Sequence, residues 1–183
     1  MGNLVVYTGP MKCGKTKKLI SKYNEVKEQN LKTFMFKPTI DDRFDKVAVV
    51  SRDGDSVEAK CINTIDDLIN YAFICDNIFI DEFQFLSGHI DVILNLLSKG
   101  KNIYVAGLNL TAERKPFGLM PELMCYATHI EVMQGNCDIC GKPNGVFTYC
   151  KEEKTEDILV GDAQYLCACN KCYLDKVAVK RCI

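Results

Sequence analysis

Apolar residues along this chain follow two patterns. Four short, almost continuous apolar runs are bounded by Gly, Pro or polar residues, as is typical of strands buried on both faces; they lie at 3–8, 32–37, 77–81 and 102–106. Between them, apolar residues recur at helical spacing in 15–29 and 89–99, and Gly100 follows the second stretch as a helix-ending residue. Strands that alternate with helices predict an α/β fold with a parallel sheet and right-handed crossovers.

Two further segments have weaker patterns. Residues 40–60 are rich in Asp, Arg and Gly, and they predict a loop with one short strand at 47–51. Thr64 and Asp67 have the spacing of a capping box in which Asp takes the place of Glu. The apolar residues that follow recur at helical spacing and predict a helix; they are Ile65, Leu68, Ile69, Ala72 and Phe73.

Composition limits the possible classes of protein. The chain has 183 residues, with 23 Lys and Arg against 24 Asp and Glu, which suits one globular domain or one with a small appendage. No apolar run approaches the ~20 residues of a membrane span, and the N-terminus lacks signal-peptide features, so we expect a soluble cytoplasmic protein. Balanced charge argues against wrapping of duplex nucleic acid. Lysines concentrate in 12–37, either on a solvated helix face or as a local field for a nucleoside triphosphate.

The most specific motif follows the first predicted strand. It has the pattern GxxxxGKT and consists of Gly9, Pro10, Met11, Lys12, Cys13, Gly14, Lys15 and Thr16. In such a phosphate loop, backbone N–H groups surround phosphate oxygens at a helix N-terminus. The lysine reaches the β and γ phosphates, and the hydroxyl of the final residue binds Mg²⁺. The motif therefore predicts binding of a nucleoside triphosphate between the first strand and the first helix.

Two acidic residues follow the third apolar run. Asp81 lies at the C-terminal end of the predicted strand, where a carboxylate can hold the water shell of Mg²⁺. Glu82 comes next, and a second carboxylate beside the metal suits the base that phosphoryl transfer needs for its attacking oxygen. The alternative for Glu82 is a solvent-facing residue at a strand end.

Eleven cysteines, an odd number, argue against a disulfide framework. Two CxxC pairs stand out, Cys137 with Cys140 and Cys169 with Cys172, and four thiolates can close a tetrahedral zinc site. The alternative is a set of redox-active or merely buried cysteines. Short cysteine-bearing segments begin after residue 135, so we expect a boundary near 133–136. It would divide a nucleotide-binding domain at 1–134 from a zinc-binding domain at 135–183.

The order of motifs along the chain is GPMKCGKT, IDDRFD, VSRDG, IFIDEFQF, AGLNLTAERKPFG, CxxC, VFTY, VGDAQY and CxxC. From about residue 4 to residue 173 this order resembles the type II thymidine kinases, zinc-containing enzymes that transfer phosphate from ATP to the 5′-hydroxyl of thymidine. The resemblance implies a P-loop NTPase-type parallel sheet flanked by helices, a small C-terminal zinc-binding domain and a homotetramer. It also implies ATP, Mg²⁺, structural Zn²⁺ and a pyrimidine deoxynucleoside as ligands, without nucleic-acid or membrane partners.

The resemblance further implies roles for single residues. Glu82 would take the proton from the nucleoside 5′-hydroxyl, Thr16 and Asp81 would serve Mg²⁺, and the four CxxC cysteines would bind zinc. Asp81 and Gln84 would join the phosphate loop at the ATP site. Residues at positions that line or close over the nucleoside are Met11, Arg43, Asp53, Ala112, Phe117, Thr148, Gly161 and Tyr165.

Departures from the family pattern cluster on the acceptor side. Ala112 stands where the family has a Phe that packs against the base, and stacking of a base on an aromatic ring is worth roughly 1–3 kcal/mol. Arg52 replaces a His, Cys150 replaces an Arg, and the loop at 151–165 is a residue short. We therefore expect preserved donor chemistry with an altered pyrimidine preference, such as one for larger 5-substituents.

Three functions are open from the sequence. A deoxynucleoside kinase accounts for every motif. A catalytically degenerate nucleotide-binding protein accounts for the acceptor-side departures, but it also predicts loss of Lys15, Asp81 or Glu82, which are all present. A zinc-ribbon, nucleic-acid-dependent ATPase accounts for the phosphate loop and the cysteines, but the chain has no room for a second motor domain and no basic and aromatic stripe. We rank them in that order.

Overall fold

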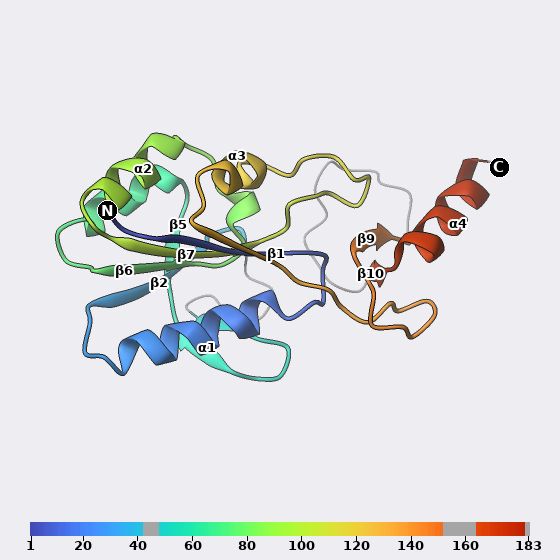
Figure 1. Ribbon diagram of the computed structural model, residues 1–183, viewed down its shortest axis with the longest axis horizontal. Coiled ribbons are helices and arrows are strands. Elements are labelled where there is room, and N and C mark those ends of the chain that lie inside the picture. Colours follow the sequence, from blue (N-terminus) through green and yellow to red (C-terminus); the bar gives the residue numbers. More distant parts are fainter. Residues whose placement is uncertain (42–47, 152–163, 182–183) are drawn as a thin grey trace.

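A computed structural model describes residues 1–41, 48–151 and 164–181 of the chain (Figure 1). Arg43 and Gly161, two of the predicted nucleoside-binding residues, lie outside the described residues. The elements follow in the order β1 (Leu4–Thr8), α1 (Lys15–Lys27), β2 (Thr33–Pro38), β3 (Ala48–Val50), β4 (Ser56–Glu58), β5 (Lys60–Ile62), the 3₁₀ helix η1 (Ile65–Tyr71), β6 (Asn77–Ile80), the 3₁₀ helix η2 (Phe83–Phe85), α2 (Ile90–Ser98), β7 (Asn102–Gly107), α3 (Met120–Cys125), β8 (His129–Val132), β9 (Phe147–Cys150), β10 (Tyr165–Ala168) and α4 (Asn170–Arg181).

The central layer is a six-stranded sheet in the order β5-β2-β6-β7-β1-β8, and every pairing in it is parallel. The four apolar runs form its four central strands, as predicted. In the register of the pairs, Thr8 lies opposite Gly107 and Ile80 opposite Val105, so β1 and β6 end at the same edge of the sheet with β7 between them. The α/β class with a parallel sheet is confirmed.

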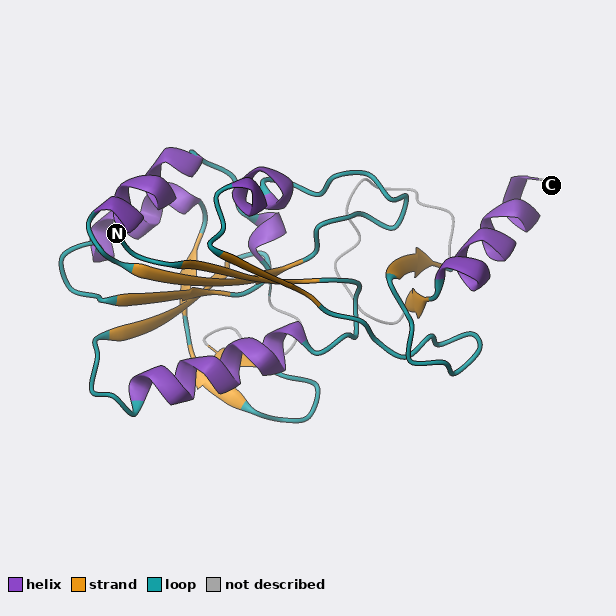
Figure 2. Ribbon diagram, viewed as in Figure 1, coloured by secondary structure: helices purple, strands orange, loops and turns teal. Residues whose placement is uncertain are grey.

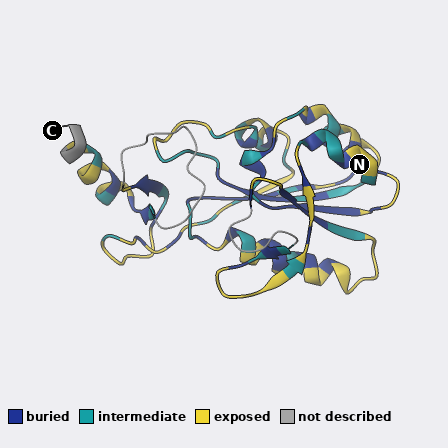
Figure 3. Ribbon diagram, turned by 180° about the vertical axis from the view of Figure 1, so that it is seen from behind, coloured by how far each residue is buried: buried dark blue, intermediate teal, exposed yellow. Residues whose placement is uncertain are grey.

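Helices cover both faces of the sheet (Figures 1 and 2). Because side chains alternate along a strand, neighbouring residues serve opposite faces. Ile78 and Ile80 of β6 face the cluster under η1, α2 and α3, whereas Phe79 packs with residues of α1 on the other face. The central strands are mostly dark in Figure 3, and the outer surface of α1 is mostly exposed, which places the core between the layers. No helix among the described residues combines the length and apolarity needed to cross a bilayer.

The segment after Thr64 is helical, but it is a 3₁₀ helix and not the α-helix that the spacing predicts. The Asp67 carboxylate accepts hydrogen bonds from the backbone N–H groups of Asn63 and Thr64, which confirms the capping role of Asp67. With three residues per turn, only positions three apart share a face. Ile65 and Leu68 are therefore buried, while Ile69 and Phe73 are 55% and 89% exposed.

Several elements lie where no helix or strand was predicted. β3 confirms the short strand predicted at 47–51, but its hairpin partner β4 and the edge strand β5, which joins the main sheet, were not predicted. The short helix α3 and the edge strand β8 lie between the fourth apolar run and the cysteines. β8 pairs with β1 although all four of its side chains are exposed or half-buried, because an edge strand needs only one hydrogen-bonded neighbour.

The C-terminal segment forms a separate small sheet of β9 and β10, followed by α4, at the end of the molecule where β1 runs into the phosphate loop (Figure 1). Its own apolar cluster contains Tyr149, Ala168 and Tyr173. A division at residue 134 stays a prediction.

Phe79 provides a test of the α1-side core. Its ring is fully buried, stacks on Tyr104 at 4.4 Å between centroids and meets Tyr23 edge-on at 5.3 Å. Phe79→Ala is expected to lower the free energy of unfolding by about 3–5 kcal/mol, because it removes the ring and leaves a cavity. Phe73→Ala, at the 89% exposed position, should change it by less than about 1 kcal/mol. Urea denaturation of both variants measures the difference, and equal losses would contradict this account of the core.

Candidate active site

The phosphate loop joins β1 to α1 and ends where the helix begins at Lys15. The Lys15 side chain is only 9% exposed and folds back over the loop. Its Nζ donates to the Pro10 carbonyl at 2.6 Å and lies 3.6 Å from the Cys13 Sγ. The ammonium group and the first N–H groups of α1 thus converge on one small region, which is an arrangement suited to an anion.

Thr16 and Asp81 meet across the edge of the sheet. The Thr16 hydroxyl donates to the Asp81 carboxylate, with oxygen distances of 3.0 and 3.3 Å. Asp81 is 5% exposed, and its burial together with the nearby charges of Glu82 and Asp41 raises its pKa to about 7, although the Thr16 hydrogen bond opposes the shift. A buried carboxylate of this kind is stabilised in its charged form by a cation, so the pair has the chemistry of a Mg²⁺ site.

Glu82 is held by Gln84. The backbone of Glu82 is left-handed, with φ of 51°, and turns its half-buried side chain away from the strand that precedes it. The Gln84 amide donates to the Glu82 carboxylate, and its oxygen accepts the Leu108 N–H at 2.8 Å. Gly107 leaves room for this amide, since a Cβ there would lie 2.7 Å from Gln84 Oε1. Gln84 therefore fixes a carboxylate beside Asp81, while its predicted contact with ATP stays a prediction.

The segment 108–118 leads from β7 along the acceptor side. Phe117 meets Phe85 edge-on, with 5.6 Å between the ring centroids. The Ala112 carbonyl accepts a 2.7 Å hydrogen bond from the Tyr173 hydroxyl of α4, and the Arg114 guanidinium lies 4.3 Å from the centre of the Phe147 ring. This segment is thus attached to the C-terminal unit at two points.

Met11 and Thr148 also meet, because the Met11 N–H donates to the Thr148 Oγ1 at 3.0 Å. Tyr165 lies near them on β10, opposite Cys150 of β9. Asp53 lies elsewhere on the surface, where its carboxylate is 2.6 Å from the Lys17 Nζ. The structure therefore brings the phosphate loop to β9, but it gives Asp53 an exposed ion pair on α1; the nucleoside roles of these residues stay predictions.

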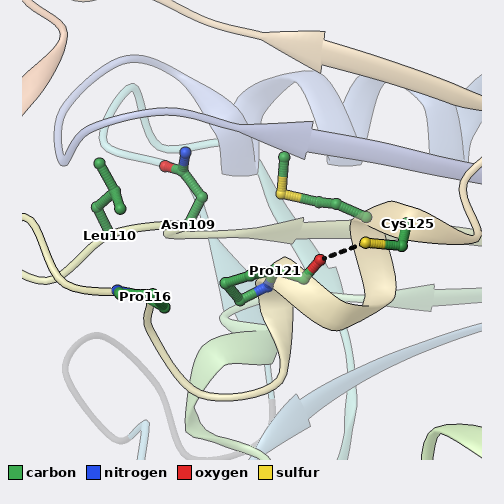
Figure 4. Close-up of a pocket in the computed structure, with 6 residues that line it drawn as sticks. Asn109, Leu110, Pro116, Pro121 and Cys125 are labelled. Atoms are coloured by element: carbon green, nitrogen blue, oxygen red, sulfur yellow. Dashed lines mark hydrogen bonds between the residues drawn. The ribbon is translucent and has the colours of Figure 1, made fainter.

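An apolar hollow of about 350 Å³ lies beside α3 (Figure 4). Its lining comes from the 109–116 segment and from α3, and it consists of Asn109, Leu110, Pro116, Pro121, Met124 and Cys125. The Cys125 thiol donates to the Pro121 carbonyl at 3.4 Å within the helix. None of the predicted site residues lines this hollow, so it is separate from the predicted nucleoside site.

The four CxxC cysteines converge as the spacing predicts. Their sulfur atoms all lie within 4.8 Å of one another, and those of Cys140 and Cys169 are 3.9 Å apart. Zinc bonds of about 2.3 Å in a tetrahedron place sulfur atoms ~3.8 Å apart, so the group fits this ion. Burial raises the pKa of Cys137, but hydrogen bonds from the Cys169 and Cys140 backbone outweigh it and lower the value to about 6. Hydrogen bonding to Cys169 raises the pKa of Cys172 to about 12.

Three residues with a place in this site were missed from the sequence. Asp41 is 9% exposed and close enough to raise the pKa of Asp81, Phe85 pairs with Phe117, and Tyr173 holds the Ala112 carbonyl. Phe85 belongs to the DEFQF segment, and Tyr173 follows the last zinc-type cysteine, so position next to a motif was the available signal. Asp41 had a signal of the same kind, because it lies in the IDDRFD motif, but that stretch was taken as a loop.

Comparison with known proteins gives a consistent result. The family model described as "Thymidine kinase" matches residues 2–173. Thymidine kinase of Pseudothermotoga lettingae is 33% identical over 98% of this chain and 98% of its own. Those of Bacteroides fragilis and Mycoplasma mobile are 33% and 34% identical over 94% and 95% of this chain and 87% and 88% of theirs. A structure titled "Crystal structure of DNA replication initiation factor" has a TM-score of 0.45 at 15% identity over 74% of this chain and 41% of its own, a likeness too slight to indicate function.

The raised pKa of Asp81 predicts a pH-dependent effect on stability. The carboxyl group loses its proton near pH 3.8 when unfolded and near pH 7 when folded, so its contribution to stability is lost as the pH rises through this range. The stability of Asp81→Asn relative to the wild type should therefore increase from pH 5 to pH 8, by an amount on the order of 2 kcal/mol.

Urea denaturation at both pH values without Mg²⁺ measures this gain, and Asp91→Asn on the exposed face of α2 is the matched control. A stability difference for Asp81→Asn that is the same at pH 5 and pH 8 would contradict the proposed burial of the charge.

Proposed function

Because the chain belongs to the thymidine kinase family, we propose that it transfers the γ-phosphoryl group of ATP to the 5′-hydroxyl of a pyrimidine deoxynucleoside. Family membership makes it a kinase. The single observation that supports the rest is the convergence of Thr16, Asp81 and Glu82 at one edge of the sheet, with Gln84 holding the last of them. Phosphoryl transfer needs a site for the phosphates, a site for the metal ion and a base for the attacking hydroxyl group.

On the donor side, we assign the phosphates to the loop from Gly9 to Thr16. Lys15 would exchange its hydrogen bond to the Pro10 carbonyl for one to a phosphate oxygen, a small rotation of a side chain that already lies over the loop. Thr16 and Asp81 would hold Mg²⁺, which neutralises charge on the phosphates when it is bound. The Asp81 carboxylate is then kept ionised at neutral pH by a cation beside it.

On the acceptor side, we assign the base to Glu82. Glu82 follows Asp81 in the chain, and its carboxylate accepts a hydrogen bond from the Gln84 amide, which orients it. In the proposed reaction this carboxylate accepts the proton of the 5′-hydroxyl as the hydroxyl oxygen attacks phosphorus. The phosphate loop would take up the negative charge that moves toward the leaving group.

We place the base of the nucleoside between the 108–118 segment and β9–β10. Ala112 replaces the Phe that is typical of the family. The Ala112 carbonyl accepts a hydrogen bond from the Tyr173 hydroxyl. The segment is therefore held in place while the side chain that would stack on the base is reduced to a methyl group. The proposal is that this protein accepts bulkier 5-substituents on the pyrimidine at the expense of affinity for thymidine.

Glu82→Gln tests the reaction class. In an ATP-consumption assay across thymidine, deoxyuridine, 5-substituted deoxyuridines, deoxycytidine and purine deoxynucleosides, the wild type is expected to turn over a pyrimidine deoxynucleoside. The amide cannot accept the proton, so the variant should lose at least 100-fold in kcat and retain ATP binding.

Three results would contradict this proposal. Turnover that survives in Glu82→Gln would remove Glu82 as the base. ATP binding without turnover of any acceptor would favour the degenerate nucleotide-binding protein instead, and ATP hydrolysis stimulated by nucleic acid would favour the ATPase.

Ala112→Phe tests the proposed specificity. Restoring an aromatic ring should raise kcat/KM for thymidine by about 5- to 150-fold, the equivalent of one stacked base, and should lower it for bulkier 5-substituted deoxyuridines. The measurement is the ratio of kcat/KM for thymidine and for the bulkier nucleosides, with Ala112→Leu as the control for volume without stacking. An unchanged ratio in Ala112→Phe would contradict the proposal.

A further inference from the structure

Two consecutive residues of the phosphate loop, Met11 and Lys12, contact the cysteine-bearing segment. The Met11 N–H donates to the Thr148 Oγ1 at 3.0 Å, and the Lys12 Nζ lies 3.2 Å from the Asp138 Oδ2. Lys12 has a left-handed backbone, with φ of 65°, and its side chain is 25% exposed. In the described structure its ammonium group is therefore engaged by a carboxylate outside the loop.

Asp138 is the second residue of the first CxxC pair, so it moves with the cysteine cluster. Its Oδ2 accepts the Cys167 N–H at 2.9 Å, and its own N–H donates to the Cys167 carbonyl at 2.8 Å. Two backbone-anchored hydrogen bonds thus fix the carboxylate that meets Lys12. The position of this carboxylate depends on how the chain is folded around the four sulfur atoms.

Gly135 fills the remaining space between the two units. A Cβ on Gly135 would lie 2.9 Å from the Cys167 Sγ, 3.3 Å from the Lys12 carbonyl oxygen and 3.4 Å from the Cys13 Cα. The backbone at 135 is therefore in contact with the loop on one side and with Cys167 on the other. A shift of the cysteine segment would be transmitted to Lys12 and Cys13 directly, because close-packed atoms leave no gap to absorb it.

We infer that Lys12 and Asp138 are positioning residues that couple the four-cysteine centre to the phosphate loop, so that metal at the cysteines strengthens ATP binding. The inference rests on the proposed ATP site at this loop. Coupling between two sites is reciprocal, so ATP must in turn hold the metal more tightly. A partly exposed ion pair contributes little by itself, and the expected coupling is therefore about 3- to 10-fold.

The test measures the rate at which the zinc-loaded protein loses Zn²⁺ to a chelating dye, with and without Mg²⁺-ATP. ATP should slow the loss about 3- to 10-fold in the wild type. Asp138→Asn keeps an oxygen that can accept the Cys167 N–H but removes the charge that pairs with Lys12. This variant should bind zinc at the four cysteines normally, and ATP should slow its zinc loss much less than in the wild type. Lys12→Gln, which leaves the cysteine segment intact, should reduce the effect in the same way.

Lys18→Gln is the matched control, because the Lys18 Nζ pairs with Glu131 of β8 at 3.4 Å, outside the cysteine segment. It should retain the full effect of ATP. ATP affinity of each protein is measured in parallel by calorimetry. ATP that binds the wild type without slowing zinc loss would overturn the coupling and leave the proposed function intact, as would a full effect in Lys12→Gln. ATP that does not bind at all would overturn both.

Discussion

The site depends on one constraint: β1 and β6 both pair in parallel with β7, one on each side of it. Parallel strands all end at the same edge of the sheet, so the phosphate loop after β1 and the acidic pair after β6 leave it side by side, one strand apart. The Thr16–Asp81 hydrogen bond spans that strand. An insertion that shifted β7 by one residue would move its alternating side chains to opposite faces and separate the two groups.

The electrostatics of the site follow from this geometry. Asp81 and Asp41 are buried and Glu82 is half-buried, so three acidic groups lie close together in a partly desolvated region. The Lys15 ammonium group, which the proposal assigns to the phosphates, is hydrogen-bonded to the Pro10 carbonyl within the loop. A nucleoside triphosphate with a bound divalent cation brings phosphates to the positive group and a cation to the acidic groups. Nucleotide and metal are therefore expected to bind as one unit.

Much of the fold could be predicted from the sequence, because the four central strands are almost continuously apolar and the phosphate-loop motif identifies the strand before it and the helix after it. The prediction of an α-helix from Ile65 was wrong in the type of helix. Apolar residues at this spacing also allow a 3₁₀ helix, in which Ile65 and Leu68 are buried. β8 could not be predicted because its pairing is through backbone groups and its side chains are polar or exposed. The contact of Gln84 with Glu82 was equally hidden, because it depends on Leu108 and on the space at Gly107, both distant in sequence.

The most direct test of the central claim is a crystal structure with Mg²⁺, a non-hydrolysable ATP analogue and thymidine. The account predicts phosphates in the loop at Gly9–Thr16, the metal beside Thr16 and Asp81, and the 5′-oxygen within about 3 Å of a Glu82 carboxylate oxygen and in line with the γ-phosphate. A nucleoside bound with its 5′-oxygen away from Glu82, with the nucleotide in place, would contradict it.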